Sequence, residues 1–117
     1  MRDRIALLLA AALLIGGPSW DAAAASSGNP TNDRLLAMPE AQQAQALGNI
    51  LRRGCVGVAA FPMGVTASGR AKGDAYWSVR CKNGKSYAVQ IPPRGKGAVV
   101  VECQVLQGTG RECFKKF

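Results

Sequence analysis

The stretch that decides the fold runs from residue 76 to residue 91 and reads Tyr76-Trp77-Ser78-Val79-Arg80-Cys81-Lys82-Asn83-Gly84-Lys85-Ser86-Tyr87-Ala88-Val89-Gln90-Ile91. Two runs that contain β-branched and aromatic residues flank a turn sequence, residues 82–85, that contains Asn-Gly. This pattern is typical of a β-hairpin with strands over residues 76–82 and 86–91. The hairpin is the clearest element of the chain, and the other elements are placed around it.

The register of this hairpin follows from the face that it must bury. A two-residue Asn-Gly turn would set apolar side chains of one strand beside small or polar side chains of the other. A three-residue turn, with Gly84 in the left-handed conformation, shifts the pairing by one residue and so inverts every side chain of one strand. We predict this second register because it separates a buried face from an open one. The buried face holds Trp77, Val79, Tyr87 and Val89, and the other face holds Ser78, Arg80, Ser86 and Ala88.

The elements on either side of the hairpin predict an α+β fold, with one N-terminal helix packed on a small, disulfide-stapled antiparallel β-meander. Residues 26–38 indicate a flexible mature N-terminus, with a helical turn capped by Asn32 or Asp33. Pro39 suits the first position of a helix over residues 40–53, and Gly54 suits its C-terminal cap. An irregular first strand over 56–66 and a last strand over 98–106 complete a single domain, 39–117, which ends in a basic tail.

The first 25 residues predict export. Arg2 and Arg4 precede an apolar run over residues 5–15, and small alanines at 22–25 follow it. This layout is typical of a signal peptide cleaved after Ala24 or Ala25. The run is too short to span a bilayer, which needs about 20 residues. We therefore expect a periplasmic or secreted protein without a transmembrane segment after cleavage; an uncleaved anchor or a buried helix is the alternative.

The four cysteines allow three pairings. In a meander, Cys81 and Cys103 would lie on strands separated by a third strand, at about 10 Å, which is beyond disulfide reach. We therefore predict the bridges Cys55–Cys81 and Cys103–Cys113. A zinc site is the alternative, but the chain has no C-x-x-C pair and no histidine.

The charge of the chain points to an anionic partner. Two basic and two acidic residues lie in the leader, which leaves 13 basic and five acidic residues and the whole net charge of +8. Such a balance predicts attraction to anionic polymers or surfaces, although it also promotes solubility. The candidate binding residues, which we expect to converge on one end of the sheet, are Arg80, Lys82, Lys85, Arg94 and Lys96.

No constellation in the chain predicts catalysis. Without histidine there is no Ser-His-Asp or Cys-His arrangement, and the spacing of the five acids suggests no acid/base pair. We expect no catalytic residue, no metal ligand and no cofactor. Trp77 and Tyr87 are predicted core residues, whereas Tyr76 is the better candidate for an exposed aromatic contact.

The hairpin segment 76–91 and the ending Glu112-Cys113-Phe114-Lys115-Lys116-Phe117 resemble small exported proteobacterial proteins of unknown function. More loosely, a helix followed by a meander with this hairpin is similar to PepSY-like and BamE-like small α/β modules. That resemblance implies a binding or assembly module rather than an enzyme.

The most consistent interpretation is a small exported binding module of basic character. Its partner would be an anionic envelope polymer, a lipid headgroup or an acidic protein surface, and not a specific nucleic acid. The alternatives are a structural or stress-related envelope protein without a ligand, and a small hydrolase or transferase that uses acids alone.

Overall fold

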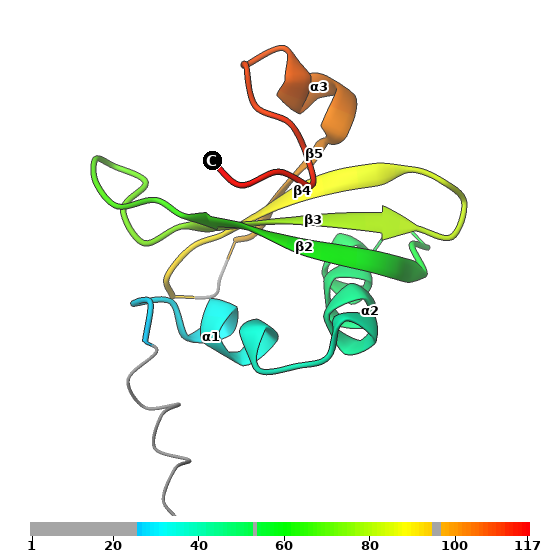
Figure 1. Cartoon of the computed structure of the whole chain (residues 1–117), viewed down its shortest axis with the longest axis horizontal. Coiled ribbons are helices and arrows are strands. Elements are labelled where there is room, and N and C mark those ends of the chain that lie inside the picture. Colours follow the sequence, from blue (N-terminus) through cyan, green and yellow to red (C-terminus); the bar gives the residue numbers. More distant parts are fainter. Residues whose placement is uncertain (1–25, 53, 95–96) are drawn as a thin grey trace, which may run out of the picture.

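The fold has three layers (Figure 1). The computed structural model describes residues 26–52, 54–94 and 97–117, so the expected signal peptide lies outside the described residues. Helices α1 and α2 cover one face of a four-stranded sheet, and α3 with the C-terminal segment lies over the other face. The predicted α+β class, a helix packed on an antiparallel meander, is confirmed. In chain order the elements are α1 (Pro30–Leu36), α2 (Glu40–Leu51), β2 (Gly57–Val65), β3 (Ala75–Cys81), β4 (Ser86–Ile91), β5 (Val99–Glu102) and α3 (Cys103–Gln107).

The central hairpin has the predicted register. The sheet order is β2-β3-β4-β5, all antiparallel, and Val79 pairs with Tyr87 while Trp77 pairs with Val89. Gly84 takes the left-handed conformation, with φ of 91°, because the three-residue turn needs it there. All four side chains that we predicted to face inward are buried, and they form one core with residues of α1 and α2.

Helix α2 approaches the sheet closely at a glycine. A Cβ on Gly48 would lie 2.8 Å from the carbonyl oxygen of Cys55, and a Cβ on Gly57 would overlap the carbonyl oxygen of Ala44. Gly48 thus allows α2 to pack closely on the segment that leads into β2. The predicted helix end is wrong, because α2 stops at Leu51 and Arg52, not Gly54, forms the left-handed C-cap with φ of 54°.

The segment that we expected to be flexible is anchored to the sheet. Helix α1 begins at Pro30 and its cap is Asn29, not Asn32 or Asp33. Asn29 is fully buried, and its Nδ2 donates to the carbonyl oxygens of Gly73 (2.8 Å) and Ile91 (2.9 Å). A side chain that caps a helix and also binds the β2–β3 loop and the end of β4 draws its whole segment into the domain.

The last strand is shorter than predicted. Strand β5 ends at Glu102, and residues 103–106, which we expected to extend it, belong to α3. Glu102 pairs with Tyr87, which lies one residue from the start of β4. Beyond that pair the neighbouring strand gives way to the hairpin turn, so a longer β5 would lack hydrogen-bond partners. Val105 consequently lies on a helix and is 62% exposed.

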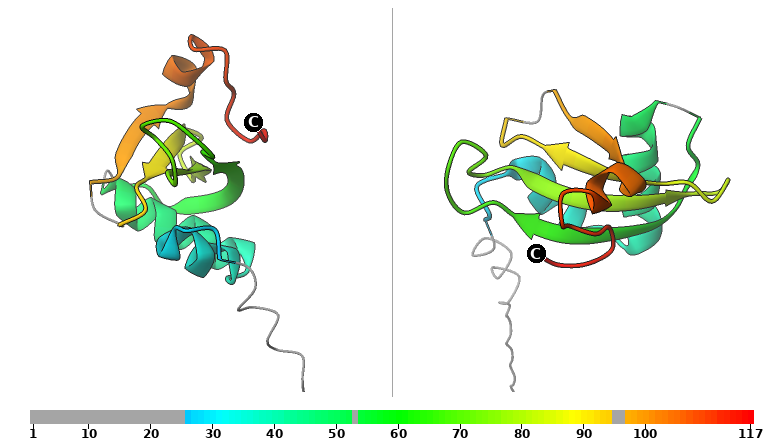
Figure 2. Two further views of the ribbon diagram at one scale, coloured as in Figure 1. Left: turned by 90° about the vertical axis from the view of Figure 1, so that its left-hand side faces the viewer. Right: turned by 90° about the horizontal axis from the view of Figure 1, so that it is seen from above.

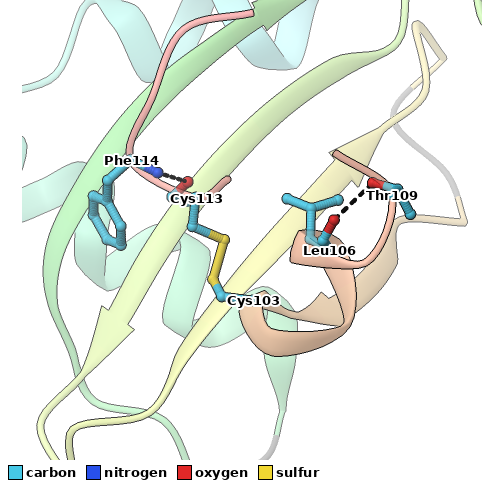
Figure 3. The surroundings of a disulfide bond; sticks show 6 residues. Cys103, Leu106, Thr109, Cys113 and Phe114 are labelled. Carbon is cyan, nitrogen blue, oxygen red and sulfur yellow. Dashed lines mark hydrogen bonds between the residues drawn. A yellow bond between two sulfur atoms is a disulfide. The ribbon is translucent and has the colours of Figure 1, made fainter. Parts of the chain in front are cut away.

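Both predicted disulfides are confirmed. Cys55–Cys81 joins the segment after α2 to the end of β3, with the Cα atoms 5.1 Å apart. Cys103–Cys113 closes the loop that contains α3, with the Cα atoms 5.8 Å apart (Figure 3). Within the described residues, none of the helices is long and apolar enough to cross a membrane.

Candidate functional site

The C-terminal segment covers the outer face of the sheet, the face opposite α1 and α2 (Figure 2). Phe114 donates its backbone N–H to Ser78 Oγ at 2.8 Å, and Phe117 donates its N–H to the carbonyl oxygen of Met63 at 3.2 Å. Ser78 and Met63 are 0% and 1% exposed. Ser78 lies on the face that we expected to be open, so the segment converts the outer face of β2 and β3 into a second packed layer.

A bulge in β2 makes room for this layer. The pairing of β2 with β3 shifts between Pro62 and Gly64, and both residue types are common at such irregularities of a strand. A Cβ on Gly64 would lie 3.1 Å from the ring of Phe117. Gly64 therefore lets the Phe117 ring approach the backbone of the strand.

Aromatic rings and cations alternate across this outer layer. The Phe61 and Phe114 ring centroids lie 6.3 Å apart, and Tyr76 meets Phe117 edge-on at 5.2 Å. Cations lie over these rings, which is a stabilising arrangement. We call this set the basic-aromatic surface, and its members are Phe61, Tyr76, Phe114, Phe117, Arg80, Arg111, Lys115 and Lys116.

The stacking distances show which cation lies on which ring. The guanidinium carbon of Arg80 is 5.0 Å from the centre of the Phe114 ring. That of Arg111 is 4.4 Å from the centre of Phe117 and 5.8 Å from that of Tyr76. The Lys116 ammonium is 6.0 Å from the centre of the Phe61 ring.

The basic-aromatic surface is strongly positive. All four of its cations are exposed, and Lys115 also forms a 2.9 Å ion pair with Glu112. Because both partners of that pair are exposed, it is a weak interaction. A cleft of about 390 Å³ lies beside it, lined by Met63, Gly110, Arg111, Glu112, Lys115, Lys116 and Phe117. Three of the lining residues are cations and one is an acid, so the lining as a whole attracts phosphate, sulfate or carboxylate groups.

The cations predicted from the sequence do not converge on one end of the sheet. Arg80 belongs to the basic-aromatic surface, whereas Lys82 and Lys85 lie at the tip of the β3–β4 hairpin. Arg94 follows β4 and so lies at the opposite end of the sheet, and Lys96 is outside the described residues. Six residues of β4 separate the two ends by about 20 Å, because each residue of a strand adds about 3.3 Å.

The residues that sequence reasoning missed are those of the tail. Tyr76 was expected to be an open aromatic contact, but its ring packs against Phe117 and under Arg111. The signal was present in residues 111–117, where two phenylalanines are interleaved with three cations. A tail of cations alone would stay in water, whereas phenylalanines in it need an apolar surface to cover.

The described acids occupy separate structural positions. Asp33 accepts from the hydroxyl of Ser27 at 2.8 Å, and Asp74 accepts from the amide of Gln90 at 2.6 Å. Glu40 accepts the backbone N–H of Ala60 at 3.2 Å. In the part of the chain that the structure describes, no three His, Cys, Asp or Glu side chains gather to hold a metal ion.

Comparisons of the chain with protein-family models, with curated proteins and with solved structures find no match.

Proposed function

We propose that this chain is a small exported binding module that contacts an anionic partner through the basic-aromatic surface. One observation carries the proposal: four cations, Arg80, Arg111, Lys115 and Lys116, gather on a single layer of the molecule. Three of them lie over aromatic rings within 6.0 Å. A cation that rests on a ring is already ordered, so it loses less conformational freedom when it binds an anion.

The export part of the proposal rests on two features of the chain. The arrangement of residues 1–25 is that of a signal peptide, and all described cysteines are bridged. N-terminal sequencing of the protein recovered from the periplasm or the medium tests this part. The expected first residue is Ala25 or Ser26, and recovery of a chain that starts at Met1 would contradict cleavage.

Binding to an anionic partner is tested by retention on immobilised heparin or polyphosphate at increasing salt. Exposed charges are screened beyond about 8 Å at physiological ionic strength, so the protein should elute early in a salt gradient once Lys115 and Lys116 are replaced by Glu. The matched control is Arg34→Glu with Lys72→Glu, which changes the net charge equally but away from the basic-aromatic surface. Both control residues are exposed, and neither belongs to the outer layer.

Three results are informative. Earlier elution of the tail variant than of the control supports a binding surface on the outer layer. Equal elution of the two variants means that only the net charge of the protein matters, as expected if the positive charge serves solubility. If Lys82→Glu with Lys85→Glu has the larger effect, the partner meets the hairpin tip, and the tail is not the site.

A further inference from the structure

We propose that the partner of the basic-aromatic surface is an anionic lipid bilayer, into which α3, in the loop from Cys103 to Cys113, inserts the exposed side chain of Val105. This inference rests on the proposed function and names the partner. Three observations support it: exposed apolar side chains in the same layer as the cations, a disulfide-closed loop with a hydrogen-bonded turn, and ring faces that the chain itself already covers.

Apolar side chains are exposed on the same side of the sheet as the cations. Val105, on α3, is 62% exposed and Phe117 is 52% exposed. Figures 1 and 2 show that α3 projects from the outer face, away from α1 and α2. The layer therefore presents Val105 at its outermost element and Arg111, Lys115 and Lys116 nearer the sheet. Peripheral membrane proteins combine these two features, an apolar tip for the acyl boundary and cations for the headgroups.

The turn that follows α3 is hydrogen-bonded within the loop, which lowers the cost of bringing it into a region poor in water. Thr109 donates its hydroxyl to the carbonyl oxygen of Leu106 at 2.7 Å (Figure 3). It donates its N–H to the same oxygen at 2.9 Å, and Gly110 donates its N–H to the carbonyl oxygen of Gln107 at 3.1 Å. The disulfide Cys103–Cys113 joins the two ends. Hydrogen-bonded polar groups cost little free energy to bring into the membrane interface. A loop closed by a disulfide also loses little conformational entropy when it binds.

The covered ring faces favour a bilayer over a single-stranded nucleic acid. Single-stranded nucleic acids bind by stacking their bases on free aromatic faces. Here Arg80 lies over Phe114, Lys116 over Phe61 and Arg111 over Phe117. A polymer that stacks would have to displace these cations, whereas a bilayer needs only their charge and a shallow apolar insertion. Each cation near an anionic membrane strengthens binding by about fivefold.

The test is flotation of the oxidised, exported protein with two kinds of vesicle. One kind is phosphatidylcholine alone, and the other contains one-third phosphatidylglycerol. The variants are Val105→Ser on α3 and Lys115→Glu with Lys116→Glu in the tail. Their matched controls lie away from the basic-aromatic surface, on α1 and in the β2–β3 loop. They are Leu36→Ser, where Leu36 is 50% exposed, and Arg34→Glu with Lys72→Glu. All variants share one N-terminus, so differences among them report on the exchanged side chains.

We expect the unmodified protein to bind only the anionic vesicles. The affinity for these vesicles should fall about fivefold for Val105→Ser and at least about 25-fold for the tail variant. The control Leu36→Ser should bind the vesicles with an affinity within about twofold of that of the unmodified protein. The charge control, Arg34→Glu with Lys72→Glu, should bind much more tightly than the tail variant. Equal binding of Val105→Ser and Leu36→Ser overturns insertion of the loop. Retention on heparin or polyphosphate without vesicle binding overturns the bilayer as the partner but leaves the proposed function standing.

Discussion

Trp77 donates its indole N–H to Asn32 Oδ1 at 2.8 Å, and both side chains are buried. The bond joins residues 45 positions apart and holds α1 against the middle of the sheet. Because Trp77 is fully buried, water cannot replace Asn32 as the acceptor without entering the core.

Replacing Asn32 by Ala should therefore leave the indole N–H without a partner. We expect a loss of about 1–3 kcal/mol in the free energy of unfolding, measured by urea titration with Trp77 fluorescence as the probe. Asn49→Ala, at an exposed position on α2, is the control and should change stability by less than about 0.5 kcal/mol. Equal stability of the two variants would mean that α1 does not depend on this bond.

Gly48→Ala should destabilise the protein although alanine is the better helix former. Helix propensity alone predicts a gain of up to about 1 kcal/mol. The new Cβ would lie 2.8 Å from the carbonyl oxygen of Cys55 and 3.0 Å from the backbone nitrogen of Gly57, and backbone atoms cannot move aside alone. We expect a net loss of about 1–3 kcal/mol by thermal and urea unfolding. A stabilised variant would refute the close approach of α2 to β2.

Removing the two disulfides separately should cost different amounts. The bridges join residues 26 and 10 positions apart, and the loop-entropy model gives about 3.5 and about 2.7 kcal/mol for loops of these lengths. Paired Cys→Ser variants of each bridge are compared by urea unfolding. A larger cost for removal of Cys103–Cys113 would show that the outer layer stabilises the sheet more than the entropy model allows.

Ser78→Ala should loosen the C-terminal segment without disturbing the helices. Its hydroxyl accepts the N–H of Phe114 at 2.8 Å, and the replacement removes this acceptor. We expect faster hydrogen exchange at the Phe114 amide and a loss of about 1–2 kcal/mol in stability. The control is Ser86→Ala, half-buried on the same face, which should leave Phe114 exchange unchanged. Unchanged exchange in Ser78→Ala would indicate that ring packing alone holds the segment.

The sequence predicted those parts of the fold that one local pattern determines. The need to bury one face determined the register of Trp77 and Val79 against Val89 and Tyr87, because only the three-residue turn places these four side chains on the same face. Strand spacing then excluded a Cys81–Cys103 bridge and left the observed pairing. These predictions needed no knowledge of distant contacts.

The parts that were missed depend on contacts between distant segments. Asn29 caps α1 while it binds the carbonyl groups of Gly73 and Ile91, 44 and 62 positions away, and nothing local distinguishes it from a loop asparagine. The same holds for the candidate site. Arg80 was identified from the hairpin, but the cations that join it come from a tail whose place over β2 and β3 is set by Phe114 and Phe117.

The loop between Cys103 and Cys113 has a practical consequence for protein engineering. Helix α3 contributes no buried residue, and the disulfide holds the Cα atoms at the two ends of the loop 5.8 Å apart. Foreign peptides inserted between these cysteines would be displayed with both ends fixed on a rigid sheet, without loss of any core side chain. We therefore expect the chain to serve as a scaffold for displaying inserted peptides under the oxidising conditions that form the bridges.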